Sequence, residues 1–177
     1  MNRLMIVRYT NPSRIRDQLI KCINLLGGEY SELDYTIDVY KTKARLLKER
    51  DEAPDLLPEQ YNQVLYGEVL PPGLTDEIRR TIKIFYFNLS PDSPQRDLDL
   101  VFNLFHEIRH AWQNTNGLYT DEEGQLNIDS SWDEYKNSPS EKDANEFAIS
   151  KAMEHKEQIK KIFRLPAKLD YNLKLNW

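Results

Sequence analysis

Three residues near the middle of the chain have the types and the spacing of a zinc-hydrolase site. Residues 106–110 read His-Glu-Ile-Arg-His, and on an α-helix positions i and i+4 lie one turn apart on the same face. His106 and His110 would therefore bind one zinc ion, with Glu107 beside it. Zinc lowers the pKa of a bound water toward about 7, and Glu107 would take the proton of that water and later deliver it to a leaving amine. The alternative is a pair of structural histidines, but two of the three histidines in the chain fall in this pattern.

The residues around this motif predict the helix that it requires, over about 95–114. At about 100° per residue, His106, Glu107 and His110 fall within about 100° of one another. The opposite side carries apolar residues, namely Leu98, Val101, Leu104, Phe105, Ile108 and Trp112. An amphipathic helix of this kind either turns its reactive side into a cleft or lies on the surface with that side in solvent.

The third protein ligand of a catalytic zinc must come from outside this helix. Such a site has three protein ligands and one open position. In the extended motif H-E-x-x-H-x-x-G-x-x-H a glycine and a third histidine follow, but this chain has Gln113 and Asn116 there. A second helix, predicted over about 139–164, offers Glu141 on the side that becomes apolar further along. An unpaired charge there would be costly, and a metal ion would be a partner for it.

Other assignments stay open at this point. Ser138 and Glu141 also form a capping box, which requires no metal. Asp143 is an alternative ligand, although it lies on the opposite face of the helix, and His155 is another, although its charged surroundings are typical of a solvated position. Asn145, one turn after Glu141, would hydrogen-bond to a metal ligand and orient it.

Composition and charge narrow the class of protein. The formal net charge of −5 and the pI of about 5.3 argue against a nucleic-acid partner. Cys22 is the only cysteine, so neither an intrachain disulfide nor a cysteine-based zinc site can form. No apolar stretch approaches the roughly 20 residues that span a bilayer, and the first residues lack the apolar core of a signal peptide. We expect a single domain over residues 1–177, with no membrane partner, in the cytoplasm.

The remaining pattern predicts a mixture of helices and strands around the motif. We expect a helix over 11–28, with Asn11 as its cap and Pro12 in its first turn, an ambiguous segment over 35–48, a loop over 51–60, strands over 63–70 and 81–89, and a long surface loop over 115–138. The strand over 81–89 is apolar on both faces. It would either lie buried within the sheet or offer its backbone to an extended substrate.

Two segments together resemble a known family. HEIRHAWQ, which begins at His106, and EKDANEFA, which begins at Glu141, resemble the ImmA/IrrE-type HExxH zinc metallopeptidases. The resemblance covers about 45 residues and does not extend to residues 1–80. It implies a small zincin-like α+β domain, in which a short sheet precedes the HExxH helix and a second long helix carries the third ligand. It also implies cleavage of intracellular proteins, often DNA-binding repressors. Arg109 and the acidic loop depart from common members of the family.

Three functions compete on this evidence. The first is a zinc-dependent endopeptidase that cleaves a protein or peptide substrate with Glu107 as general base. In that case Tyr119 or Tyr135, in the loop between the two helices, would donate a hydrogen bond to the developing oxyanion, although ordinary packing explains both tyrosines as well. The second is a catalytically idle metal-binding module, serving as a sensor, immunity or scaffold component, and the third is a structural domain without metal. Glu107 favours the enzyme, because a binding module has no need of a general base.

Overall fold

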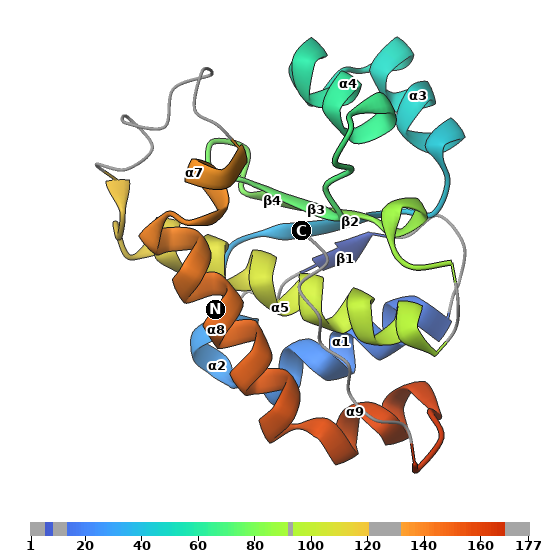
Figure 1. Ribbon diagram of the computed structural model, residues 1–177, viewed down its shortest axis with the longest axis vertical. Coiled ribbons are helices and arrows are strands. Elements are labelled where there is room, and N and C mark those ends of the chain that lie inside the picture. Colours follow the sequence, from blue (N-terminus) through green and yellow to red (C-terminus); the bar gives the residue numbers. More distant parts are fainter. Residues whose placement is uncertain (1–5, 9–13, 92–93, 121–131, 169–177) are drawn as a thin grey trace.

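A four-stranded sheet separates two unequal groups of helices in the computed structural model, which describes residues 6–8, 14–91, 94–120 and 132–168 (Figure 1). The strands are β1 (Ile6–Arg8), β2 (Thr36–Tyr40), β3 (Gly73–Asp76) and β4 (Thr81–Phe85). Their order across the sheet is β1-β2-β4-β3, with β1, β2 and β4 parallel and β3 antiparallel to β4. The expected α+β class is therefore confirmed.

The helices divide between the two faces of this sheet. In chain order they are α1 (Arg14–Leu25), α2 (Gly28–Ser31), α3 (Lys43–Glu52), α4 (Pro58–Tyr66), α5 (Gln95–Thr115), α7 (Trp132–Lys136), α8 (Pro139–Glu154) and α9 (Lys156–Phe163), and a short 3-10 helix spans Tyr86–Asn88. Figure 1 shows α1, α2, α5, α8 and α9 on one side of the sheet and the α3–α4 pair on the other. The helix that carries the HExxH motif thus lies in the larger layer.

The alternation of side chains along β4 builds a separate core on each face. Successive residues of a strand point to opposite faces. Ile82 and Ile84 join the larger core, with residues of α1 and α5, whereas Phe85 joins the smaller core with residues of α3 and α4. Both faces of β4 are thereby buried, which explains its apolar sequence.

Strand β4 lies inside the sheet and has no free edge. All five of its residues, Thr81–Phe85, pair with β2, and its first four pair with residues 73–76 of β3. The hypothesis that residues 81–89 offer their backbone to a substrate is therefore wrong, and the alternative of a buried central strand is confirmed. The strand is also shorter than predicted, because residues 86–88 turn into the 3-10 helix.

The strand predicted over 63–70 is instead helical in its first half, residues 63–66, and belongs to no helix or strand in its second half. Pro58 occupies the first turn of α4, where its missing N–H costs nothing, and the Gln60 side chain accepts a hydrogen bond from the Leu57 N–H at 2.9 Å. Val64 and Leu65 pack into the smaller core. The apolar residues that indicated a strand are thus the buried side of a helix, and part of the loop expected over 51–60 belongs to α3 and α4.

The other expectations hold in part. The ambiguous segment over 35–48 contains β2 and then α3, whose cap Thr42 accepts from the Arg45 N–H at 3.4 Å. The helix expected over 11–28 is α1, followed after Gly27 by the short α2. The expected cap at Asn11 and Pro12 lies outside the described residues, as do residues 121–131 and 169–177.

The long helix predicted over 139–164 is two helices. His155 ends α8 and begins α9 with non-helical backbone angles, so the chain changes direction there. The start is as predicted: Pro139 occupies the first turn, and the Glu141 N–H donates to Ser138 Oγ at 3.3 Å. Within the predicted loop over 115–138, the structure has the short helix α7.

Candidate metal centre

The HExxH motif lies on the buried helix α5. This helix spans Gln95–Thr115, close to the prediction, and packs against α8 and β3. Its apolar side lies in the larger core, as expected. Its polar side is also buried, since His106 is 2% exposed and Glu107 4% exposed. The motif therefore does not lie on a surface helix with its reactive side in solvent.

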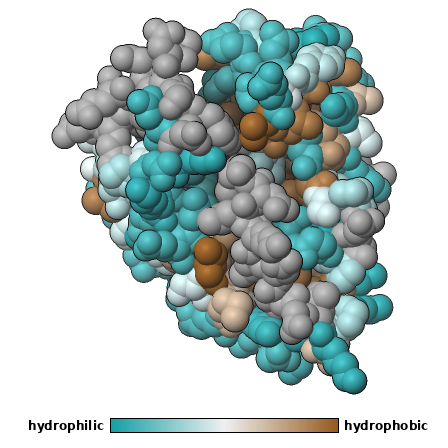
Figure 2. Space-filling view, viewed as in Figure 1, coloured by the Kyte–Doolittle hydropathy of each residue, from teal (hydrophilic) through white to brown (hydrophobic). Residues whose placement is uncertain are grey.

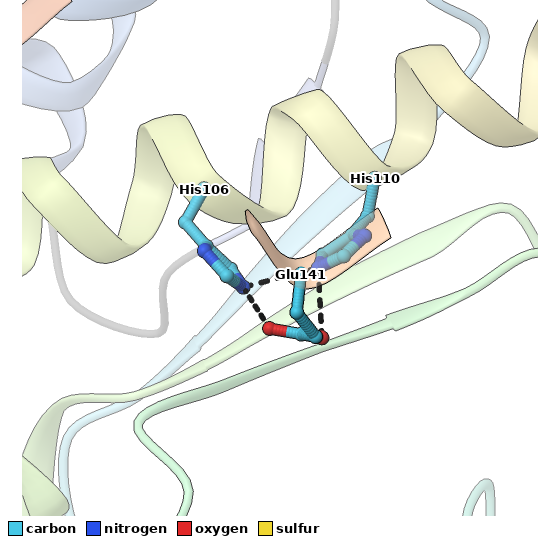
Figure 3. A group of neighbouring side chains, drawn as sticks. All are labelled: His106, His110 and Glu141. Atoms are coloured by element: carbon cyan, nitrogen blue, oxygen red, sulfur yellow. Dashed lines mark hydrogen bonds and ion pairs between the residues drawn. The ribbon is translucent and has the colours of Figure 1, made fainter. Parts of the chain in front are cut away.

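Two helices bring three ligand atoms to one point (Figure 3). His106 Nε2 lies 3.0 Å from His110 Nε2. Each oxygen of the Glu141 carboxylate faces one imidazole, with Oε2 3.3 Å from His106 Nε2 and Oε1 3.1 Å from His110 Nε2. Of the predicted ligands, the structure thus brings His106 and His110 of α5 together with Glu141 of α8.

The geometry of this group fits a zinc ion. The side chains of His106, His110 and Glu141 each offer one ligand atom, and these atoms lie within 4.8 Å of one another. A tetrahedral ion with bonds of about 2.0–2.1 Å separates its ligand atoms by roughly 3.4 Å, close to the spacings above. Two imidazoles and a carboxylate are ligand types that zinc prefers, although manganese and iron accept them too.

Contacts within the group shift the pKa values of His110 and Glu141. Burial alone would lower the pKa of His110, but the carboxylate of Glu141 outweighs burial and raises that pKa to about 9. For Glu141 itself, burial would raise the pKa, but hydrogen bonds from both histidines hold it well below its ordinary range. The carboxylate is therefore ionised and attracts positive charge to this point.

Glu107 lies beside the group and is held by β3. Its Oε2 accepts a hydrogen bond from Thr75 Oγ1 at 2.7 Å, and the same hydroxyl lies 3.0 Å from the Glu107 carbonyl oxygen. A β-carbon added at Gly73 would lie 2.5 Å from Glu107 Oε1, so the glycine leaves the space that the carboxylate occupies. Burial raises the pKa of Glu107, an effect that the two histidines partly offset.

A cavity of about 350 Å³ opens onto Glu107 and the three candidate ligands. Its other walls come from α4, β3, the end of α5, α7 and α8. Both tyrosines proposed as oxyanion donors, Tyr119 and Tyr135, line it. Tyr119 has a left-handed backbone, with φ of 62°, a conformation that is rare for an aromatic residue and that recurs at functional sites. The expectation of a reactive side facing a cleft is confirmed.

The alternative ligands lie elsewhere. The carboxylate of Asp143 is bound by Arg109 and Gln113 and does not join the ligand group. His155 caps α8 and lies near Glu154. Asn145 lines the cavity one turn after Glu141, and its buried Oδ1 accepts no hydrogen bond from the residues that the structure describes.

Three residues at the site were missed by sequence reasoning. Gly73 and Thr75 belong to β3, a strand of four residues that carries no run of β-branched or aromatic residues. Gln113 was considered only as a departure from the extended motif. A glycine and a threonine at alternate positions are compatible with a strand that approaches a neighbour closely, but nothing in the sequence links them to Glu107.

Comparisons with known proteins give no independent assignment. No model of a protein family matches the chain, and no curated protein or solved structure is significantly similar to it. Among the helices in the described part of the chain, none has the length and apolar character to cross a membrane.

Proposed function

We propose that the chain is a zinc-dependent endopeptidase of the zincin-like, ImmA/IrrE type that cleaves an intracellular protein. The observation that supports this most strongly is the convergence of His106, His110 and Glu141 from two helices, with the buried Glu107 beside them on the wall of a cavity. A structural histidine pair would require neither a carboxylate from a second helix nor a general base. The resemblance in sequence is confined to the same two helices.

The roles of the residues follow from their placement. The ion would be held by His106, His110 and Glu141. When bound, it would act as a Lewis acid and lower the pKa of a bound water molecule. Glu107 would accept a proton from the attacking water and pass it to the leaving amine. Thr75 keeps the Glu107 carboxylate in one orientation through the hydrogen bond at 2.7 Å. Tyr119 and Tyr135 remain candidates for stabilising the oxyanion, since both line the cavity.

We assign the binding site of an extended peptide to the outer edge of β3, with which no strand among the described residues pairs. In an antiparallel pair, successive residues alternate between hydrogen-bonding to the partner strand and pointing away from it. The Phe85 N–H donates to the Pro72 oxygen at 2.8 Å, so the backbone groups of Gly73 and Thr75 point away from β4. Both residues line the cavity. Strand addition, which β4 cannot provide, is therefore available at β3, next to Glu107.

The test compares wild type with Glu107→Gln. Glutamine keeps the size of the side chain and its bond to Thr75 but cannot accept the proton, so cleavage should fall by about 10²–10⁴-fold or more. Metal content, measured by elemental analysis of protein purified without a histidine tag, should stay near one zinc per chain. A repressor encoded beside the gene is the first substrate to try and generic unfolded protein the second, with new N-termini identified by mass spectrometry.

The outcomes of this test separate the competing functions. Cleavage of the true substrate by Glu107→Gln at the wild-type rate would contradict the mechanism. Zinc in both proteins with cleavage by neither would favour the idle metal-binding module. Wild-type protein without any divalent metal would leave only the structural domain.

A further inference from the structure

Gln113 occupies a buried position between the two helices that carry the candidate ligands. It lies on α5 three residues after His110 and is 2% exposed. Its Nε2 donates to Asp143 Oδ2 at 2.6 Å and to the Ser140 carbonyl oxygen at 3.1 Å. Both of these partners are acceptors only, and both belong to α8. The orientation of the Gln113 amide is therefore fixed, with its Oε1 on the other side.

This orientation decides which ring nitrogen of His110 carries a proton. Gln113 Oε1 lies 2.8 Å from His110 Nδ1, and because an amide oxygen can only accept, Nδ1 must donate. In the neutral imidazole the lone pair then belongs to Nε2, the atom that faces His106 and Glu141. An amide in the opposite orientation would place a donor against Nδ1 and favour the wrong tautomer.

Arg109 in turn fixes the acceptor that orients Gln113. Its Nε and one terminal nitrogen donate to the two oxygens of Asp143 at 2.8 and 3.1 Å, the two-point geometry that is strongest for this pair. The guanidinium also lies over the ring of Trp112, 4.1 Å from its centre, and donates to the Tyr30 hydroxyl at 2.8 Å. Asp143 therefore has little freedom to move away from Gln113.

We infer that Gln113 is a positioning residue for the metal site: held by Asp143 and Arg109, it fixes the tautomer of His110 and the spacing between α5 and α8. The inference rests on the proposed metal site but concerns residues that are not ligands. Through Ser140, Gln113 is bonded to the residue immediately before Glu141, so a single side chain controls ligands on both helices. It also accounts for Arg109 and Asp143, which the ligand set leaves without a role.

The experiment measures zinc affinity of Gln113→Met by competition with a chelator. Methionine has a similar length but neither donates nor accepts strongly, so the dissociation constant should rise by about 10–100-fold, the usual effect of losing a partner of a metal-ligating histidine. The visible spectrum of the cobalt(II)-substituted protein should change as well, because it reports the geometry of the ligands. Neither quantity would move if Gln113 contributed to the stability of the fold without affecting the placement of the ligands.

A matched control removes a similar bond far from the site. Gln18 of α1 is also buried, and its Nε2 donates to the Ile162 oxygen at 3.0 Å. Gln18→Met also loses a buried amide hydrogen bond and should lower the melting temperature of the metal-free protein, though by less than Gln113→Met, which loses three. It should leave zinc affinity and the cobalt spectrum unchanged. Asp143→Asn is a second variant, which keeps the inference testable if Gln113→Met fails to fold, and it should raise the dissociation constant by about tenfold, the lower end of the same range.

Each result decides the inference. Wild-type affinity and an unchanged cobalt spectrum in Gln113→Met, or in Asp143→Asn if only that variant folds, would overturn it while leaving the proposed function intact. Equal losses of affinity in Gln113→Met and Gln18→Met would also overturn it, because stability alone would then explain both. A wild-type protein that binds no divalent metal would overturn the proposed function and the inference together.

Discussion

The protein buries two clusters of charged side chains, one on each face of the sheet, and they differ in how their charges are matched. On the side of α3 and α4, Lys83 of β4 is 0% exposed. Its Nζ lies 2.7 Å from Asp55 Oδ2, 2.9 Å from the Tyr40 hydroxyl and 3.3 Å from Glu49 Oε1. The hydroxyl of Tyr40 also bonds to Glu49. The ammonium group donates hydrogen bonds to Tyr40 and Glu49 and forms an ion pair with Asp55, so its charge is matched by groups of the chain itself.

The cluster on the side of α5 differs, because its ligand atoms face one another and no cation of the chain lies between them in the described structure. Two imidazole nitrogens face each other at 3.0 Å, each imidazole faces a carboxylate oxygen, and the group opens onto a cavity. Such a set of ligand atoms is best satisfied by a cation from outside the chain. Buried charge by itself therefore does not indicate a functional site. The proposed metal site rests instead on the convergence of ligand atoms beside a cavity.

The largest expected effect is on metal binding. His106→Ala or His110→Ala should weaken zinc binding by about 10²–10³-fold or more, because one of three ligands carries roughly a third of a binding free energy on the order of 10 kcal/mol. Lys83→Met, in the other cluster, should leave zinc affinity unchanged. Chelator competition measures all three variants. Full metal content in both histidine variants would show that the two clusters do not differ as described.

The second prediction concerns stability, and here the larger effect is expected from the Lys83 cluster. Lys83→Met leaves Glu49 without its cation, whereas Asp55 keeps its ion pair with Arg79 at 2.8 Å. Breaking a buried ion pair costs about 3–5 kcal/mol, and because both carboxylates are partly exposed, the free energy of unfolding should fall by about 3 kcal/mol, the lower end of that range. Urea titration of the metal-free protein measures this. An unchanged midpoint would mean that the cluster does not stabilise the contact of α3 with the sheet.

The third effect tests the space beside Glu107. Gly73→Ala places a β-carbon where the Glu107 carboxylate lies and should lower cleavage by roughly 10²-fold, the effect of moving a reacting group by about 1 Å, while zinc stays bound. Gly28→Ala is the control, because a β-carbon there lies no closer than 3.4 Å to its neighbours. Equal activity of the two variants would indicate that the Glu107 side chain can move without loss of function. That result would contradict the proposal that β3 holds Glu107 in place.

The candidate ligands could be predicted from sequence because their signals are local. His106 and His110 lie on one helix whose period the sequence shows, and Glu141 follows a capping serine on a helix with a small, apolar inner side. The prediction of β4 succeeded for the same reason, since its apolar residues alternate between two cores.

The parts that could not be predicted depend on contacts between distant segments. Gly73 and Thr75 form a strand only because β4 pairs with them, and the role of Gln113 depends on where α8 packs. In α4, the apolar residues Val64 and Leu65 suit a strand as well as a helix, and packing against Tyr40 and Phe85 decides between the two.

The position of β3 also limits the physical state of any protein that enters the cleft. An open strand edge pairs with whatever strand can reach it. Gly73, Leu74 and Thr75 form one wall of the cavity, and α4, α7 and α8 supply other walls. A single extended chain added to β3, as proposed, would bring no neighbouring strand with it, whereas the edge of a folded sheet would bring its other strands against those walls. For the endopeptidase proposed above, the target would therefore have to present a locally unfolded stretch, such as a linker or a terminus, and the free energy of that local opening would limit the rate of cleavage.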